Sequence, residues 1–273
     1  MGQGAPALLC GPRSMTSRAT GASKAKTAQA GEVVETAKTL VYALLIALVL
    51  RVIVFQPYTI PSSSMEPGLV TGDYIVVSKW PYGWSRASIP FDLPLFPKGA
   101  GGRIRGRDPQ RGDVVVFRLP RDPGEAYIKR LIGLPGDRVQ VVGGEVRVNG
   151  RPIPRRFAGL AQDHDAPGRI VPRVVETAAG GRPYVTFGGA RDREGDNTQV
   201  YVVPQGHYFM MGDNRDNSLD SRWPQDVGVG FVPAENVVGR AEVVMLSWRE
   251  GASIFKPWTW FNLDAACFLQ RVR

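Results

Sequence analysis

The sequence predicts a mainly β protein in which antiparallel sheets form a barrel-like domain, preceded by one N-terminal transmembrane helix. Two observations carry this prediction. Residues 36–55 form a single apolar run, and the chain beyond it alternates segments rich in Val, Ile, Tyr and Phe with turns rich in Gly, Pro, Asp and Asn. No stretch beyond the run keeps a long 3.6-residue hydrophobic period, so strands rather than helices are expected there.

The apolar run, TAKTLVYALLIALVLRVIVF, predicts a membrane anchor. As a helix it spans about 30 Å, which matches the hydrocarbon core of a bilayer. Lys38 and Arg51 lie near its ends, where long side chains reach the headgroups. A buried core helix is one alternative, but no polar stripe interrupts residues 40–50. A cleaved signal peptide is another, but no A-x-A-like cleavage site follows the run.

The charge around the anchor predicts its orientation. Beyond Arg51 the next basic residue is Lys79, whereas five basic residues lie at or before the start of the run: Arg13, Arg18, Lys24, Lys26 and Lys38. The positive-inside rule therefore predicts a cytoplasmic N-terminus and an outer location for the remainder. Residues 1–35, rich in Ala, Gly, Ser and Thr, are expected to be a disordered cytoplasmic tail, and residues 36–56 the anchor.

The β region is predicted to contain a main domain, residues 57–150 and 201–273, and an inserted smaller cap subdomain, residues 151–200. Strand-like segments occur at 73–80, 112–119, 126–133, 138–153, 184–189, 199–204, 207–212 and 241–248. Residues 140–150, QVVGGEVRVNG, predict a hairpin with a Gly-Gly turn. Residues 81–110, dense in Pro, Gly and Arg, suit a long surface loop. The aromatic and basic C-terminal tail suits either contact with lipid or packing on the domain.

Composition narrows the chemistry. The 273 residues carry a net charge of +9, which suits an anionic membrane surface or nucleic acid and alone does not choose between them. The two cysteines, Cys10 and Cys267, lie at opposite ends of the chain, and no Cys/His cluster has zinc spacing. We therefore expect neither a disulfide framework nor a structural metal, and the sequence indicates no cofactor.

Several familiar catalytic patterns are absent from the sequence: G-x-S-x-G, H-E-x-x-H and the phosphate-binding G-x-x-x-x-G-K-[ST]. Residues 212–221, GDNRDNSLDS, have the acidic character of a calcium loop but not its spacing. His207 lies on a predicted strand, where a lone histidine is more often structural than catalytic. His164 lies in a polar inserted loop and is a weaker candidate still.

The segment IPSSSMEPG, residues 60–68, places three serines between two prolines just beyond the anchor. A serine without a histidine can be activated by a neutral lysine, whose usual pKa of about 10.4 must then be lowered by burial. Lys129 fits, because strand alternation in AYIKRLIG puts it on one face with Tyr127 and Leu131. Taken alone, a lysine that reaches solvent at a sheet edge is the simpler interpretation.

Three long stretches favour the catalytic interpretation of Lys129, because together they resemble the bacterial type I signal peptidases. These are membrane-bound serine proteases with a Ser/Lys dyad. The stretches are PSSSMEPGLVTGDYIVVSK (61–79), RGDVVVFRLP (111–120) followed by YIKRLIGLPGD (127–137), and MGDNRDNSLDSR (211–222) followed by GFVPAENVVGRA (230–241).

The resemblance implies roles for individual residues. Ser64, directly before the methionine, matches the nucleophile, and Lys129 matches the general base. The hydroxyl of Ser62 and the backbone N–H of Ser64 match the donors that bind the oxyanion. Ser63 receives no role. Ser218 matches a serine that orients the lysine.

The resemblance also implies supporting and substrate-contacting residues. Asp220 and Arg222 match a supporting ion pair, with Asp213 in the same loop; packing is the alternative role for all three. The residues that match substrate-contacting positions are Tyr58, Ile60, Tyr127 and Ile128.

The implied activity is removal of N-terminal signal peptides from exported preproteins, with cleavage after small residues through an acyl-enzyme. The implied location is the bacterial inner membrane, with signal peptides and lipid as partners and the secretion translocon as a further one. Two alternatives stay open: a membrane-anchored peptide-binding β domain without catalysis, and a peptidase dedicated to one pilin-type substrate. A DNA-bound self-cleaving repressor is disfavoured, because it needs a helix-turn-helix head where the apolar run stands. No nucleic-acid partner is expected.

Overall fold

The computed structural model describes residues 19–88, 103, 106–163, 168–178, 180–188, 193–248, 257–259, 262 and 268–272. The side chains of residues 19–31, 52–53 and 257 are not described. The predictions for His164, both cysteines, most of residues 81–110 and most of the C-terminal tail lie outside the described residues. The chain divides into two units, residues 1–49 and 50–273, which are described separately.

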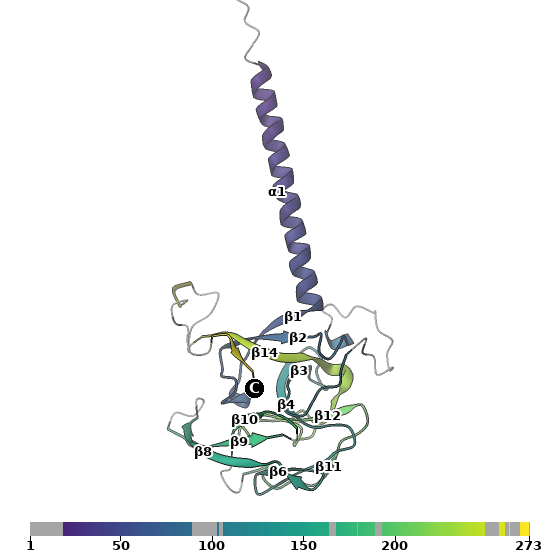
Figure 1. Cartoon of the computed structure of the whole chain (residues 1–273), viewed down its shortest axis with the longest axis vertical. Helices are drawn as coiled ribbons and strands as arrows, with labels where there is room; N and C mark the ends of the chain where they lie inside the picture. Colours follow the sequence, from purple (N-terminus) through teal and green to yellow (C-terminus); the bar gives the residue numbers. More distant parts are fainter. Residues whose placement is uncertain are drawn as a thin grey trace, which may run out of the picture. The chain divides into compact units, whose positions relative to one another are not determined.

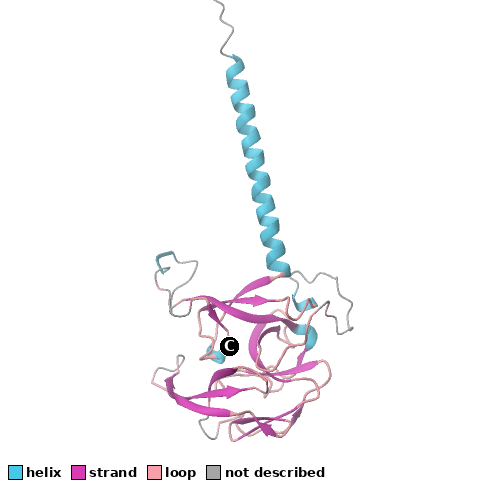
Figure 2. Cartoon of the chain, viewed as in Figure 1, coloured by secondary structure: helices cyan, strands magenta, loops and turns pink. Residues whose placement is uncertain are grey.

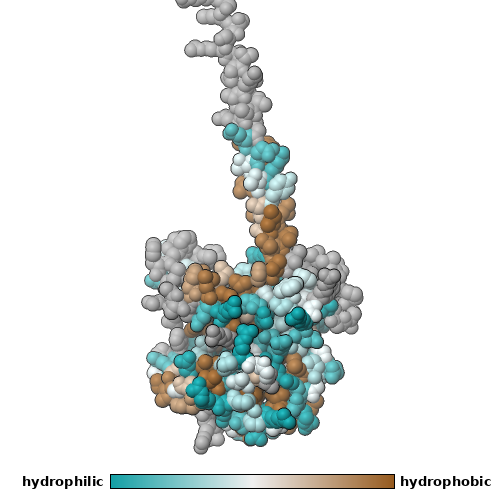
Figure 3. All heavy atoms as spheres, viewed as in Figure 1, coloured by the Kyte–Doolittle hydropathy of each residue, from teal (hydrophilic) through white to brown (hydrophobic). Residues whose placement is uncertain are grey.

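The first unit is built on one long helix, α1, which runs over Ala19–Ile53 and continues into the second unit (Figure 1). The part long and apolar enough to cross a membrane is Glu32–Arg51, and none of it is buried (Figure 3). An unburied helix that is apolar on all sides, as this one is from Leu40 to Leu50, is typical of a membrane span rather than of a core helix. The apolar span is therefore confirmed, although it lies four residues earlier in the chain than the run 36–55.

The helix begins well before the predicted anchor, within the segment for which the sequence predicts a disordered tail. Residues 19–35 include five alanines, two lysines, two glutamates and a glutamine, which extend an existing helix at little cost. At the other end the helix stops at Ile53, and Phe55 already belongs to the first strand. The predicted anchor thus overlaps strand β1 by two residues.

The second unit is mainly β, as predicted (Figure 2). Among the described residues its largest sheet has eight strands. Their order is β1-β2-β14-β3-β4-β12-β13, with β15 also paired to β14, and all pairings are antiparallel. The strands are β1 Phe55–Thr59, β2 Asp73–Ser78, β3 Val114–Arg118, β4 Ala126–Gly133, β12 His207–Met211, β13 Val232–Pro233, β14 Val237–Ser247 and β15 Gln270–Arg271. Bulges in β14 bend the sheet, which curls into a half-barrel.

Two smaller sheets complete the unit. The four-stranded sheet β11-β5-β6-β7 comprises Tyr201–Val202, Arg138–Val142, Glu145–Val148 and Arg151–Pro152. Its β5–β6 hairpin turns at Gly143 and Gly144, whose φ angles of +56° and +74° suit glycine, so the predicted hairpin is confirmed. We call the three-stranded sheet β10-β9-β8 the inserted sheet; it comprises Pro183–Phe187, Ile170–Thr177 and Arg155–Gln162.

The inserted sheet lies within the predicted cap, residues 151–200. However, β7 pairs with β6, so the four-stranded sheet crosses the predicted boundary at residue 150 and includes the first two residues of that cap. Among the described residues, short 3-10 helices connect other elements: η1 Ser63–Met65, η2 Arg86–Ser88, η4 Ala234–Asn236 and η5 Pro257–Thr259.

Strand β3 explains where the core lies. Its residues 114–117 are all buried, because Val114 and Val116 face one hydrophobic cluster while Val115 and Phe117 face another. A strand covered on both faces loses the alternation of a half-exposed strand. Strand β4 pairs with β3 so that Lys129 lies opposite Val115. The lysine is therefore carried into the interior and does not reach solvent at an edge.

Candidate active site

The serine-rich turn connects β1 to β2 and is fixed by its apolar neighbours. Ser63, Ser64 and Met65 form η1, and the N–H of Leu69 bonds to the carbonyl of Met65 at 3.0 Å. Met65 and Leu69 are almost fully buried in the cluster beneath β1 and β2. Because these two side chains hold the turn against the core, Ser64 stays in one place with only 9% of its surface exposed.

Lys129 meets Ser64 from β4. Its Nζ lies 2.6 Å from Oγ of Ser64. The ammonium donates this hydrogen bond when the lysine is charged, and the hydroxyl donates it when the amine is neutral. Lys129 is 3% exposed, and its Nζ lies 5.8 Å from the ring centre of Tyr127 on the same strand face. The predicted pairing of Tyr127 and Lys129 on one face is therefore confirmed.

The charge state of Lys129 follows from its surroundings. Burial lowers the pKa of its ammonium from 10.5 to about 8. The carboxylates of Asp220 and Asp213 act in the opposite direction, and Arg222 adds to the lowering. At pH near 8 a large fraction of Lys129 is thus neutral and able to accept a proton.

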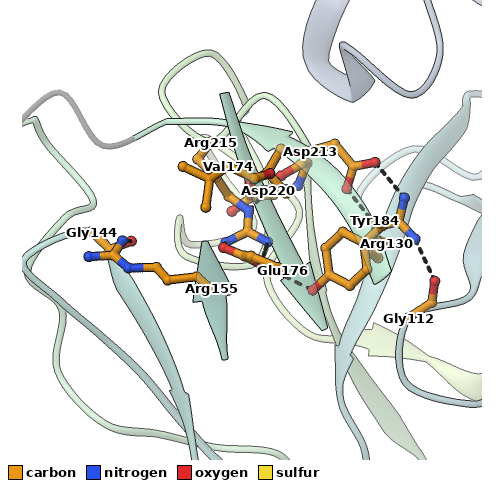
Figure 4. A network of polar contacts seen from close by, with 12 residues as sticks. Gly112, Arg130, Gly144, Arg155, Val174, Glu176, Tyr184, Asp213, Arg215 and Asp220 are labelled. Atoms are coloured by element: carbon orange, nitrogen blue, oxygen red, sulfur yellow. Dashed lines mark hydrogen bonds and ion pairs between the residues drawn. The ribbon is translucent and has the colours of Figure 1, made fainter. Parts of the chain in front are cut away.

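Arginines hold both of these carboxylates. Asp213 accepts two hydrogen bonds of 2.6 Å from Arg130, and Asp220 accepts bonds of 2.9 and 3.0 Å from Arg222 (Figure 4 shows the Arg130 pair). Burial alone would raise the pKa of Asp220, but Arg222 and the Gly212 N–H bring it below its ordinary value. The acidic loop that suggests calcium therefore has arginines as counterions for these two residues.

The loop after β12, residues 212–222, packs directly on the serine turn. The N–H of Asn214 bonds to the carbonyl of Ser64 at 3.1 Å, and its amide Nδ2 bonds to the carbonyl of Ser63 at 3.3 Å. Asn217 donates to Oγ of Ser63 at 3.0 Å. The sequence assigned no role to Ser63, yet its buried side chain joins the two segments. Only the repeated Asn of the GDNRDNS motif hinted at such contacts.

Gly212 is the point of closest approach. A Cβ there would lie 2.3 Å from Oγ of Ser218 and 2.5 Å from the carbonyl oxygen of Ser64. Ser218 therefore stands next to the nucleophile's backbone. Its Oγ is buried and has no hydrogen-bond partner among the described residues, and no bond from it to Lys129 is formed in this structure.

Ser62 lies on the open side of the turn. It is exposed, and its Oγ lies 3.3 Å from Oγ of Ser64. A hydroxyl at that distance can reach a group bonded to the nucleophile. Its predicted part in binding an oxyanion stays a prediction.

The predicted substrate-contacting residues flank the dyad on β1 and β4. Tyr58 and Tyr127 are half-buried, whereas Ile60 is only 2% exposed and Ile128 9%. Tyr58, Ile60 and Ile128 all belong to or pack against the cluster under the serine turn. In this structure Ile60 offers a peptide almost no side-chain surface, so any contact with it would be through its backbone or after a shift.

His207 is placed differently from a catalytic base. Its ring Nδ1 lies 3.0 Å from the carbonyl oxygen of Gln205, in the turn just before β12. The described residues contain no group of three or more His, Cys, Asp or Glu side chains that could hold a metal ion.

A buried serine–lysine pair on a β scaffold indicates a serine hydrolase that works without histidine. Comparison with known proteins narrows the class. Residues 33–248 match the family model described as signal peptidase, peptidase S26. The chain belongs to this family, and it is a serine endopeptidase anchored in a membrane.

Individual relatives agree with the family. The signal peptidase I of Rickettsia typhi is 39% identical over 236 residues, which cover 80% of this chain and 86% of the relative. That of Rickettsia akari is 41% identical over 217 residues, covering 76% and 77%. A solved signal peptidase I from Enterococcus faecalis V583 is 28% identical and covers 49% of this chain and 97% of its own. Its TM-score of 0.28 is too low to carry a structural conclusion.

Proposed function

We propose that this protein removes N-terminal signal peptides from exported preproteins, with Ser64 as nucleophile and Lys129 as general base. The observation that carries the proposal is the distance of 2.6 Å between Lys129 Nζ and Ser64 Oγ, at a lysine whose buried position favours the neutral amine. Nucleophile and base are then within direct proton-transfer distance.

The reaction follows from this geometry. Lys129 takes the proton of Ser64 while Oγ attacks the carbonyl carbon of the scissile peptide bond. The tetrahedral intermediate collapses as the Lys129 ammonium gives that proton to the departing amine, and an ester to Ser64 remains. Lys129, neutral again, takes a proton from water, whose oxygen attacks the ester. Lys129 then returns the proton to Ser64 as the acid product leaves.

Two further serine side chains, those of Ser62 and Ser218, act in this scheme. The Ser62 hydroxyl and the Ser64 N–H donate to the oxyanion, which needs donors directed at the developing charge. The Ser218 hydroxyl orients Lys129. In its favour, Ser218 Oγ is buried and has no hydrogen-bond partner among the described residues, so it can accept a bond from the lysine when Ser64 does not.

The substrate is proposed to bind as an extended strand between β1 and β4. Within the described chain, strand β1 pairs only with β2. The first half of β4, Ala126–Lys129, pairs there only with β3, because β12 begins its pairing at Arg130. Two unpaired strand edges thus flank the dyad and can accept backbone hydrogen bonds from a peptide. Small residues before the bond would suit the nearly closed surface at Ile60 and Ile128.

The anchor gives this activity a place. We propose that α1 crosses the bacterial inner membrane with its N-terminus in the cytoplasm, so that the β unit works on the outer side, where a preprotein's cleavage site emerges. The five basic residues at or before the start of the apolar run support this orientation. Membrane lipid and the translocon are the further partners expected there.

A cleavage assay tests the proposal. Full-length protein in detergent is incubated with a preprotein, and the product is followed by its size and N-terminal sequence. Ser64→Ala and Lys129→Ala should each lose nearly all activity. Lys79→Met is a matched control, because Lys79 is also fully buried with a pKa of about 8, yet it bonds to the Ser88 carbonyl away from the dyad.

Undiminished cleavage by both dyad variants would reject the mechanism. Inactive wild-type protein that still binds signal peptides would favour the non-catalytic peptide-binding domain. Cleavage of several unrelated preproteins would argue against a peptidase dedicated to one pilin-type substrate.

A further inference from the structure

The inserted sheet does not stand apart from the active site, because its last strand joins the 212–222 loop. The N–H of Phe187, at the end of β10, bonds to the carbonyl of Asp213 at 2.9 Å. The N–H of Arg215 bonds back to the carbonyl of Phe187 at 2.7 Å. Phe187 and Asn214 thereby form a short parallel bridge. The loop that packs on Ser64 is thus an added edge of the inserted sheet.

A buried ion pair reinforces this junction. Glu176 on β9 accepts bonds of 2.9 and 2.6 Å from the two terminal nitrogens of Arg215 (Figure 4). The side chains are 4% and 7% exposed, and the hydroxyl of Tyr184 on β10 donates to Glu176 at 3.1 Å. A two-pronged arginine–carboxylate contact fixes orientation as well as position. The inserted sheet therefore holds Arg215 in a single arrangement.

Arg215 passes this constraint on to the residues around the dyad. Its Nε donates to the carbonyl of Gly212 at 3.1 Å, and its own carbonyl accepts a bond of 2.6 Å from Arg222. Arg222 in turn holds Asp220, whose charge acts on Lys129. The groups that connect Glu176 to Lys129 are all buried, and the last link, from Asp220 to Lys129, is electrostatic.

A second contact runs beside the first. The guanidinium carbon of Arg130 lies 4.0 Å from the ring centre of Tyr184, and the same arginine holds Asp213 (Figure 4). Stacking of arginine on an aromatic face is favourable and directional. Both carboxylates next to Lys129 are therefore supported from the inserted sheet.

We propose that Glu176 is a positioning residue of the active site, which anchors Arg215 and thereby holds the 212–222 loop beside Ser64 and Lys129. The proposal rests on the proposed peptidase mechanism. In it, the inserted sheet holds the 212–222 loop in position. Removing the Glu176 charge leaves Arg215 buried without its counterion, so the loop must shift or admit water.

The test uses full-length protein in detergent and a preprotein substrate. Glu176→Gln keeps the shape of the side chain and removes its charge; kcat should fall about tenfold. KM should change less than about twofold, because the proposed peptide edges on β1 and β4 do not touch Glu176. Glu176→Asp keeps the charge on a shorter stem and should recover part of the lost kcat.

Glu145→Gln is the matched control. Glu145 contacts Arg147 at 3.3 Å and Arg155, the first residue of the inserted sheet, at 3.7 Å. Neither arginine belongs to the 212–222 loop, so this variant should keep wild-type kcat. Hydrogen exchange gives an independent reading: amides of residues 212–222 should exchange faster in Glu176→Gln and unchanged in Glu145→Gln.

Wild-type kcat and unchanged loop exchange in Glu176→Gln would overturn the proposal. So would a loss of kcat that follows the unfolded fraction and disappears on cooling well below Tm, since that is a loss of stability only. If wild-type protein cleaves no preprotein, the proposed function fails, and Glu176 then positions no active site. The hydrogen-exchange data would still show whether Glu176 holds the 212–222 loop in position.

Discussion

Lys129 shows how packing can prepare a side chain for chemistry. The same strand pairing that places it opposite Val115 removes it from water, and burial then lowers its pKa to about 8. Two nearby carboxylates would oppose this change more strongly if they were not held by Arg130 and Arg222. The pKa of this lysine therefore depends on residues from three separate parts of the chain.

The pH dependence of cleavage should follow this lysine. Below pH 8 the ammonium dominates and cannot accept a proton, whereas above pH 8 the neutral amine dominates. We therefore expect kcat/KM to rise about tenfold per pH unit below the pKa and to level off above about pH 8. The measurement is the initial rate between pH 6 and 10. A rate that stays constant over this range would show that no lysine near pKa 8 limits the reaction.

The serines differ in how far the sequence could predict them. The resemblance singled out Ser62, Ser64 and Ser218. In the structure Ser62 Oγ lies 3.3 Å from Ser64 Oγ, and Gly212 lies between Ser218 and the carbonyl of Ser64. The contact that Ser63 makes could not be predicted, because its partner Asn217 is 154 positions away. A hydrogen bond between segments so distant leaves no pattern in a single sequence.

At the scale of elements, the end of β12 is shaped for close contact. The pairing of β12 with β4 shifts register between Phe209 and Met210, and such irregularities redirect a strand. Directly afterwards Gly212 brings the chain against Ser64 and Ser218. The strand thus delivers the 212–222 loop to the serine turn.

Substitution of Gly212 should test this contact. Gly212→Ala inserts a Cβ within 2.5 Å of the Ser64 carbonyl oxygen and of Ser218, so the loop must move away. We expect cleavage to fall more than tenfold, with a loss of stability of about 1–3 kcal/mol. Activity and Tm are measured together.

Gly124→Ala is the control for Gly212→Ala. At Gly124 the added Cβ meets only the flexible side chain of Asp122 in an exposed turn. Equal activities of the two variants would mean that the approach at Gly212 is not needed for catalysis.

At the scale of the whole molecule, local patterns were enough for the class of fold. Apolar segments separated by turns predicted β2, β3, β4 and β12, and the two glycines of residues 143–144 predicted the β5–β6 hairpin. The order of the strands could not be predicted, because β14 pairs with β2 and β3 from far along the chain. Nor could the link from Glu176 to Arg215, since buried ion pairs between distant segments have no local signal.

The predicted orientation can be tested with the two native cysteines. Cys10 precedes the apolar span and Cys267 follows it, so they should lie on opposite sides of the membrane. A maleimide that cannot cross membranes should label Cys267 but not Cys10 in intact spheroplasts. Variants with only one cysteine, Cys10→Ser or Cys267→Ser, identify which residue reacts, and permeabilised cells give the total. Labelling of Cys10 in intact spheroplasts would reverse the assigned topology.

The buried lysine should also limit the stability of the molecule. In the unfolded chain Lys129 keeps its proton up to pH 10.5, but in the folded chain only to about pH 8. At pH 7 the burial of Lys129 therefore lowers the free energy of unfolding by about 3 kcal/mol, and this loss decreases as pH rises from 8 to 10.5. Lys129→Met removes the charge but also loses the bond to Ser64, worth about 1 kcal/mol.

We therefore expect Lys129→Met to abolish cleavage. Its free energy of unfolding at pH 7 should nevertheless be about 2 kcal/mol higher than that of the wild type, which raises Tm by about 4–8 °C. The gain should shrink when the same thermal unfolding, followed by circular dichroism in detergent, is repeated near pH 10. Ser64→Ala loses the same hydrogen bond but keeps the buried lysine, so its Tm should not rise. If Lys129→Met is less stable than wild type at pH 7, burial costs the Lys129 ammonium little, and its pKa is not lowered enough for it to be the base near pH 8.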